Sequence, residues 1–245
     1  MKEQRFFYTP EPETGQLPDE EAQHAVRVLR LQMGDELNLM DGKGVFYRAI
    51  ITEASNHRCR YRILESQPQQ PEWTGTIHLA VAPTKNMDRM EWLAEKATEI
   101  GFDRFSLLDC RFSERRVVKT ERLEKILVSA MKQSHKAWLP VLDEMESFQQ
   151  FIHRTDLPEQ RFIAHCYEAV PASEGAPEGA KPFLLDVLQS RVSALVLIGP
   201  EGDFSIDEVQ AAEAAGFRSI SLGTSRLRTE TAALAAVHMM RLANR

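Results

Sequence analysis

The sequence contains no long apolar run. A membrane-spanning helix needs about 20 consecutive, mostly apolar residues, and the 245 residues include no such stretch. Residues 1–8 also lack the apolar segment of a secretory signal peptide. We therefore expect a cytoplasmic protein that does not enter the membrane.

Cysteine is scarce, and one nucleotide-binding motif is missing. The three cysteines, Cys59, Cys110 and Cys166, are odd in number and show no C-x-x-C spacing. This pattern predicts buried thiols rather than a disulfide framework or a zinc site, so we expect no bound metal. The sequence also lacks a lysine-bearing P-loop, which weakens any assignment to phosphate chemistry.

Negative charge predominates overall, but one segment is basic. The formal net charge is −6, which by itself argues against a nucleic-acid partner. Residues 111–136 nevertheless hold eight basic residues against three acidic ones, a local charge of +5. A solvated basic helix would give the same pattern, but this clustering favours contact with RNA. The basic residues are Arg111, Arg115, Arg116, Lys119, Arg122, Lys125, Lys132 and Lys136.

Residues 1–68 are predicted to form a small, mostly β domain. A short helix begins near Pro18, and a turn at residues 41–44 joins strands at 36–40 and 45–52. Residues 58–63 alternate with a period of two, so their three arginines share one face, which either contacts phosphates or is solvated. The polar, proline-containing residues 67–71 are the expected linker.

Residues 73–245 are predicted to form a parallel α/β domain. A strand at 76–82, a helix at 88–100 and a strand at 105–108 give the β-α-β order of a parallel sheet with crossover helices. The further expected elements are a helix at 120–136, strands at 162–166, 195–198 and 219–222, and a loop at 172–181.

Two glycine-containing strand exits are the most informative stretches. The run 195–205, LVLIGPEGDFS, is a buried strand that breaks into a loop, and Ser205 and Glu208 have capping-box spacing. In the run 222–233, LGTSRLRTETAA, glycine ends a strand and Thr229 or Thr231 could cap the last helix. Both could be ordinary strand exits. Because ligands of parallel sheets bind beyond the carboxyl ends of the strands, we favour one ligand site bordered by both loops.

These runs carry a family resemblance. Ile198-Gly-Pro-Glu-Gly-Asp-Phe, Leu222-Gly and Leu227-Arg-Thr-Glu-Thr-Ala232 resemble the signatures of the RsmE family of ribosomal RNA uridine methyltransferases, in the SPOUT superfamily. The resemblance implies an α/β SPOUT-type parallel sheet with a trefoil knot, preceded by a small PUA-like β-barrel. It also implies S-adenosyl-L-methionine as cofactor, a homodimer, and N3-methylation of one uridine in small-subunit (16S) ribosomal RNA, as free RNA or in the assembled subunit.

Asp203 departs from the family pattern, which has a glycine at this place. Aspartate tolerates a positive φ less well than glycine, so the loop could differ in conformation.

The resemblance also implies site residues. The N-terminal barrel would help to hold RNA through Arg5 and Arg30. The charge clustering in the basic segment adds Arg111, Arg115, Arg116, Lys119 and Lys136 as expected RNA contacts. The expected cofactor-binding residues are Gly199, Glu201, Gly202, Leu222, Gly223, Leu227, Arg228, Thr229, Thr231 and Ala232.

The last helix is the expected dimer contact. Four alanines at 232, 233, 235 and 236 allow close helix approach, although they could equally pack within one subunit. The residues expected on the contact face are Leu234, Val237, His238 and Arg241.

Methylation of a uracil imide nitrogen needs a group that removes its proton. Glu230 could accept that proton while Arg228 stabilises the developing anion. Glu230 could instead be a first-turn acid favoured by the helix dipole. Two other functions stay open: phosphate chemistry with a metal held by Glu201 and Asp203, and a noncatalytic RNA-binding dimer.

Overall fold

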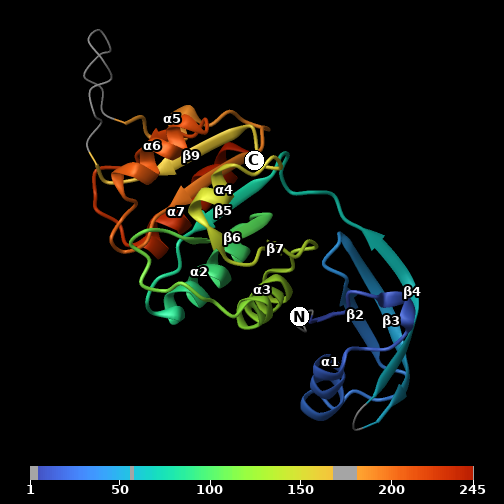
Figure 1. The fold of residues 1–245 in the computed structure, drawn as a ribbon. Helices are drawn as coiled ribbons and strands as arrows, with labels where there is room; N and C mark the ends of the chain where they lie inside the picture. Colours follow the sequence, from blue (N-terminus) through green and yellow to red (C-terminus); the bar gives the residue numbers. More distant parts are fainter. Residues whose placement is uncertain (1–4, 56–57, 168–180, 245) are drawn as a thin grey trace, which may run out of the picture. The chain divides into compact units, whose positions relative to one another are not determined.

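The computed structural model describes residues 5–55, 58–167 and 181–244. Contacts divide the chain into two compact units (Figure 1). The first comprises Met1–Pro71 and Leu127–Leu139, and the second comprises Glu72–Ile126 and Pro140–Arg245. The described helices include none that is long and apolar enough to cross a membrane.

The first unit is built on a four-stranded sheet with the order β1-β2-β3-β4. The strands are β1 (Phe6–Tyr8), β2 (Glu36–Met40), β3 (Val45–Ala54) and β4 (Cys59–Pro68). A short 3-10 helix η1 (Pro12–Thr14) follows β1, and helix α1 (Asp19–Gln23) continues into a π-helical turn η2 (His24–Val28). Leu37, Leu39, Ala22 and Ala25 are buried in its core, as the alternating pattern predicts.

Strand β4 runs further than the sequence indicates. Cys59 and Tyr61 are buried while Arg60 is exposed, so the predicted facing of residues 58–63 is confirmed. The predicted linker at 67–71 is wrong at its start, because Gln67 and Pro68 pair with Phe46 and Val45 of β3. A proline can end a strand where its missing N–H is not needed.

The basic helix α3 (Thr120–Ser134) is shared between the units. In the first unit, Met131 packs against Phe6 and Met40. The residues after the helix return to the same sheet, since Trp138 forms a bridge with Lys43.

The second unit contains a seven-stranded sheet with the order β11-β9-β10-β5-β6-β7, and β8 pairs with β6. Every pairing in it is parallel, as the β-α-β order predicts. All residues of β5 and β10 are buried, which accounts for the continuous apolar sequence of β10 and for that of β5 apart from His78. The strands are β5 (Ile77–Val81), β6 (Arg104–Asp109), β7 (Val141–Leu142), β8 (Glu146–Ser147), β9 (Gln160–Ala164), β10 (Ala194–Ile198) and β11 (Arg218–Ile220).

Helices cover this sheet (Figure 1). The long C-terminal helix α7 packs against α2, β5 and β10 through Ala233, Ala236 and Val237. The helices are α2 (Met87–Ile100), α4 (Phe148–Ile152), α5 (Leu184–Val187), α6 (Ile206–Ala214) and α7 (Thr229–Ala243).

Two predicted strands are displaced. The strand expected at 162–166 is Gln160–Ala164, because Cys166 donates its backbone N–H to Asp203 instead of joining the sheet. The strand expected at 219–222 ends at Ile220, after which Ser221 bridges to Phe183. Of the loop expected at 172–181, residues 172–180 lie outside the described residues.

Candidate active site

The two glycine-containing loops leave the same edge of the sheet. Strands β5, β9, β10 and β11 are parallel, so their carboxyl ends lie together. The exits of β5 and β10 are joined directly, since the backbone N–H of Ala82 donates to the carbonyl oxygen of Ile198 at 3.0 Å.

The first loop, Gly199 to Phe204, is tightly folded. A Cβ at Gly199 would lie 3.0 Å from the backbone nitrogen of Phe204, so a larger residue would force the loop backbone to shift. Ser205 then begins α6 with the predicted capping box to Glu208, which is confirmed.

Asp203 adopts a left-handed conformation of the kind that glycine favours. Its φ is 66°, in the left-handed region. One carboxylate oxygen accepts from the N–H of Phe204 and the other from the N–H of Cys166, both at 2.7 Å. The side chain therefore offsets the strain by fastening the loop to the end of β9. Cys166 itself is exposed, so the prediction of three buried thiols is wrong at this position.

The second loop, from Ser221 to Arg228, is open. Gly223 has a φ of 123°, and a Cβ there would meet nothing within 4 Å. The Ser221 hydroxyl accepts from the N–H of Gly223 at 3.1 Å. Among the described residues, no hydrogen bond occupies the backbone N–H groups of residues 224–228. Leu222 and Leu227 are half-buried on either side of this open backbone.

Helix α7 begins without the predicted threonine cap. Its first residue also connects the loop after β10 to the loop that precedes α7. Arg228 occupies the N-cap position without a side-chain cap, so neither Thr229 nor Thr231 is the cap. Thr229 is the first helical residue, and its hydroxyl donates to the carbonyl oxygen of Gly199 at 3.2 Å. Thr231 is exposed and Ala232 is half-buried.

Glu230 lies in the first turn of α7 and is 8% exposed. One carboxylate oxygen is 3.7 Å from Nε of Arg89, which extends from the first turn of α2. The other oxygen, Oε2, is buried and has no hydrogen-bond partner. Buried carboxylates are normally fully bonded, so an oxygen without a partner at this edge needs an explanation.

Glu201 and Lys85 connect three loops. The Glu201 carboxylate accepts from the backbone N–H of Lys85 at 2.9 Å, and the Lys85 carbonyl accepts from Arg115 at 2.7 Å. The Lys85 ammonium pairs with Glu114 at 2.8 Å, and this hydrogen bond raises the pKa of Lys85. Glu201, predicted to bind cofactor, therefore ties the loop after β10 to the loop after β5.

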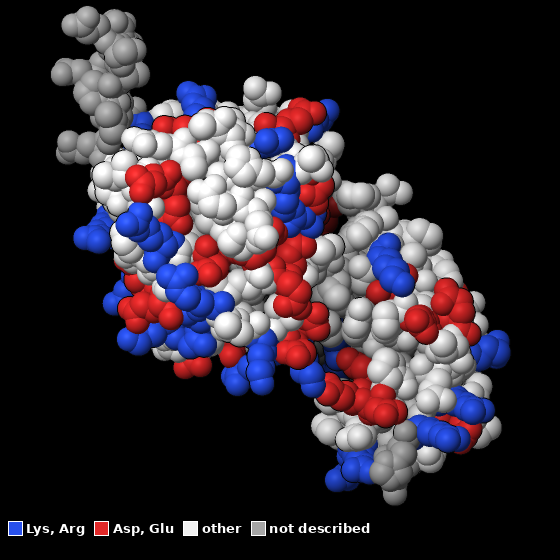
Figure 2. All heavy atoms as spheres, viewed as in Figure 1, with Lys and Arg blue, Asp and Glu red and all other residues white. Residues whose placement is uncertain are grey.

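The basic segment is largely paired within the chain. Arg111 pairs with Asp207 at 2.9 Å, and Arg116 pairs with Asp109 at 2.8 Å. Lys119 is exposed and has no ion-pair partner in the described parts of the chain. Figure 2 shows the same mixture, with acidic side chains interspersed among the basic ones. In the first unit, Arg5 and Arg30 are exposed, while Lys136 is half-buried.

The carboxylates proposed for a metal are separately engaged. Glu201 accepts from Lys85, while Asp203 accepts from Phe204 and Cys166. Within the described ranges, no group of three or more histidine, cysteine or acidic side chains is arranged to hold a metal ion.

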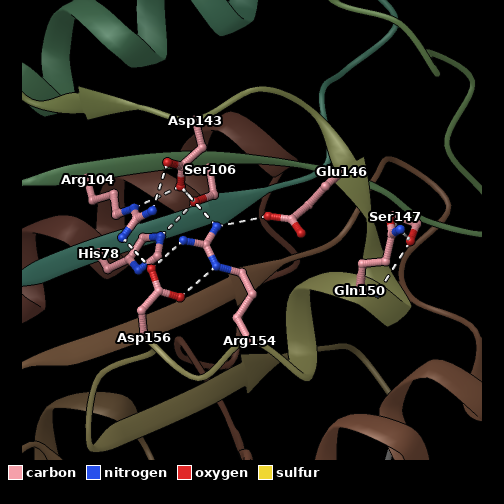
Figure 3. A network of polar contacts seen from close by, with 9 residues as sticks. All are labelled: His78, Arg104, Ser106, Asp143, Glu146, Ser147, Gln150, Arg154 and Asp156. Atoms are coloured by element: carbon pink, nitrogen blue, oxygen red, sulfur yellow. Dashed lines mark hydrogen bonds and ion pairs between the residues drawn. The ribbon is translucent and has the colours of Figure 1, made fainter.

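A second polar cluster lies near the amino-terminal ends of β5 and β6 (Figure 3). The Ser106 hydroxyl donates to Asp143, so it accepts from Nε2 of His78 at 2.7 Å. Burial and the charge of Arg104 lower the pKa of His78 to about 3. Arg154 joins the cluster by pairing with Asp143 and Glu146. This network stabilises the sheet at the ends of β5 and β6 that are opposite the glycine loops.

Two residues at the candidate site were missed by sequence reasoning. Arg89 follows a helix start and is indistinguishable in sequence from a surface arginine. Phe112 lies within a charged segment, yet it packs beside Gly202, where a Cβ would come within 3.2 Å of the Phe112 Cβ. An aromatic residue among arginines was the available signal for Phe112.

Comparisons with known proteins agree with this architecture. Residues 71–241 match the RNA methyltransferase domain family, and residues 17–64 match the RNA methyltransferase PUA domain family. A protein from Rickettsia conorii named ribosomal RNA small subunit methyltransferase E is 28% identical, with 91% of this chain and 87% of the relative covered. The protein of that name from Bacillus subtilis is 27% identical over 93% of this chain and 89% of its own length.

Solved structures share this fold over nearly the full length of the chain. A probable rRNA-methyltransferase from Porphyromonas gingivalis has 43% identity and a TM-score of 0.89, with 98% of both chains covered. The ribosomal RNA small subunit methyltransferase E of Neisseria gonorrhoeae, bound to S-adenosyl methionine, has 27% identity and a TM-score of 0.82, again with 98% of both chains covered. The chain thus belongs to the RNA methyltransferase family, within the RsmE group that the signature runs indicate.

Proposed function

We propose that this protein transfers a methyl group from S-adenosyl-L-methionine to N3 of a uridine in small-subunit ribosomal RNA. The family match, the names of the relatives and the cofactor bound to the Neisseria structure support this reaction class. The observation that carries it is the meeting of both signature loops at the start of α7, beside the buried and incompletely bonded Glu230.

The residues present fit this cofactor. Its adenine edge requires hydrogen-bond donors and acceptors, and the unoccupied backbone N–H groups of residues 224–228 can supply donors beside the open Gly223. When bound, the cofactor supplies an electrophilic methyl group. The residues that would hold it are Gly199, Gly202, Leu222, Gly223, Leu227, Arg228, Thr229, Thr231 and Ala232, with Glu201 fixing the loop between them.

Glu230 would accept the uracil N3 proton, which makes that nitrogen a competent nucleophile. The unpartnered Oε2 is the atom assigned this role, and reaching it requires a small opening because it is buried. Arg89 would orient the carboxylate, and the exposed Arg228 would stabilise the developing negative charge on the base.

We also propose a cytoplasmic homodimer and the trefoil knot implied by the resemblance. The contact face needs revision, because Val237 is buried within the subunit and Ala233 and Ala236 pack there too. The exposed residues of α7 are Thr231, His238 and Leu242, while Leu234 and Arg241 of the expected contact face are half-buried. Light scattering should give a mass of about twice 27.9 kDa, and a mass of one chain at micromolar concentration would contradict the dimer.

The reaction is tested by mapping methylated uridines in small-subunit ribosomal RNA from cells with and without the protein. One 3-methyluridine should disappear in its absence and return when purified protein and cofactor are added. A parallel cofactor titration separates the alternatives, since a noncatalytic RNA-binding protein and a phosphate-chemistry enzyme should both fail to bind S-adenosyl-L-methionine.

A further inference from the structure

Phe112 is an exposed aromatic side chain at the candidate active site. Its exposed fraction is 47%, and within the described part of the chain Trp92 is the one other exposed side chain among phenylalanine, tyrosine and tryptophan. Exposing a phenyl ring to water is unfavourable, and a smaller apolar side chain would cover the same backbone with less exposed apolar area. Folding therefore gives no reason for a phenylalanine at this position.

The backbone that carries the ring is firmly held. The N–H of Cys110 donates to the Ser113 hydroxyl, and the N–H of Ser113 returns to the Cys110 carbonyl, both at 3.0 Å. The N–H of Arg111 donates to Glu208 of α6 at 2.8 Å. The ring is therefore exposed on a turn whose backbone is held in place by these hydrogen bonds, which lowers the cost of ordering it on binding.

The ring also lies on the signature loop. A Cβ at Gly202 would be 3.2 Å from the Phe112 Cβ and 3.8 Å from the first ring carbon. The turn and the loop are further connected through Arg115, Lys85 and Glu201. A ligand resting on Phe112 would therefore lie beside the loop assigned to the cofactor.

The surroundings of the ring suit a nucleotide. The Arg111 guanidinium is 6.0 Å from the ring centroid, and Arg116 and the unpaired Lys119 follow within the same segment. Single-stranded RNA is held by aromatic rings that stack on its bases and by cations that contact its phosphates. Phe112 and its basic neighbours supply both kinds of contact.

We propose that Phe112 stacks on a nucleobase in the RNA segment that carries the methylated uridine. This assignment rests on the proposed function, because it takes RNA as the substrate. Phe112 is a positioning residue: it holds the strand against the signature loop and takes no part in proton or methyl transfer.

The test compares Phe112→Leu with Phe112→Tyr. Leucine keeps apolar volume and removes the stacking face, while tyrosine keeps the face. Filter binding of unmodified small-subunit ribosomal RNA should show about tenfold or greater weakening for Phe112→Leu and near wild-type affinity for Phe112→Tyr. Cofactor affinity should be unchanged in both variants. The control is Ile206→Ala, which removes another exposed apolar side chain and should leave RNA binding unaltered.

The salt dependence distinguishes stacking from a displaced loop. Stacking releases no counterions, so the slope of log Kd against log salt should be the same for Phe112→Leu and wild type. A changed slope, equal losses in the leucine and tyrosine variants, or wild-type affinity in Phe112→Leu would each overturn the assignment. If wild-type protein neither binds nor methylates the RNA, the proposed function fails instead.

Discussion

Glu230 is the residue on which the proposed chemistry depends. A buried carboxylate oxygen without a partner is energetically unfavourable, by about 1–3 kcal/mol, and folding alone gives no reason to retain it. Its position in the first turn of α7 provides helix-dipole stabilisation. That stabilisation explains why an acid is tolerated, but it leaves the orphaned Oε2 unexplained.

Glu230→Gln tests the proton-acceptor role, because the amide keeps the size of the side chain and removes its basicity. Single-turnover methyl transfer should fall by about 10² or more, with little change in cofactor affinity. Raising the pH should partly restore the rate, since solvent then deprotonates more of the uracil. The control is Glu95→Gln on the outer surface of α2, which should transfer at the wild-type rate. A wild-type rate for Glu230→Gln would end the catalytic assignment.

Substitutions at Asp203 test how much its two hydrogen bonds stabilise the loop after β10. Asp203→Ala removes two hydrogen bonds and keeps a side chain at positive φ, so it should lower the unfolding free energy by about 2 kcal/mol. Asp203→Gly removes the same bonds and relieves the strain, so its loss should be about 1 kcal/mol smaller. Urea unfolding measures both, and equal losses would show that the positive φ carries no strain here.

Individual elements of the second unit were largely predictable, because local patterns determine them. The apolar run of β10 and the capping box of α6 each depend on residues close in sequence. Errors arose where distant residues decide the outcome. Strand β9 ends early because Asp203 takes the Cys166 N–H, and α7 begins without a threonine cap because Thr229 donates to Gly199.

The polar network that stabilises β5 and β6 was not predictable, because it also joins residues that are distant in sequence. His78, Ser106, Asp143 and Arg154 come from four separated segments, and no spacing in the sequence relates them. At the candidate active site, sequence reasoning singled out Glu230 through its motif but not its ion-pair partner Arg89. Motifs identify residues that share a loop, whereas pairing across loops requires the fold.

The network predicts how stability depends on pH. His78 is neutral in the folded protein, with a pKa of about 3 against 6.5 when unfolded. Protonation therefore favours the unfolded state, so the stability from this group is full above pH 6.5 and is lost as pH falls toward 3. Between these values, its contribution to the slope approaches about 1.4 kcal/mol per pH unit.

Urea unfolding at pH 7 and pH 5 measures this loss. Burial would raise the pKa of Asp143, but hydrogen bonds from Arg104 and Ser106 lower it, so Asp143 stays ionised across this window. The glutamine of His78→Gln can still donate to Ser106 but does not titrate. The difference in unfolding free energy between pH 7 and pH 5 should therefore be smaller in this variant by the contribution of His78. An undiminished dependence in that variant would assign the effect to other groups.

For the molecule as a whole, counting charges in the sequence overstated the positive charge that the basic segment has available for RNA. Its residues sum to +5 in the sequence, but Arg111, Arg116 and Arg122 face carboxylates on other elements. With a net charge of −6, the protein as a whole repels RNA at long range. Binding must therefore rely on a few local cations, of which Lys119 is the clearest because no described residue pairs with it.

Lys119→Gln should weaken binding of small-subunit ribosomal RNA and reduce the salt slope of log Kd by about 0.7–0.9, the value for one lost phosphate contact. Arg116→Gln should weaken binding more, because it also leaves the carboxylate of Asp109 without its cation and facing the RNA. Lys96→Gln is the matched control, since Lys96 pairs with Glu95 and Glu99 on α2 and should leave the slope unchanged. Cofactor affinity should be the same in all three variants. If Lys119→Gln and Lys96→Gln give the same slope, the basic segment is a solvated surface and the RNA lies elsewhere.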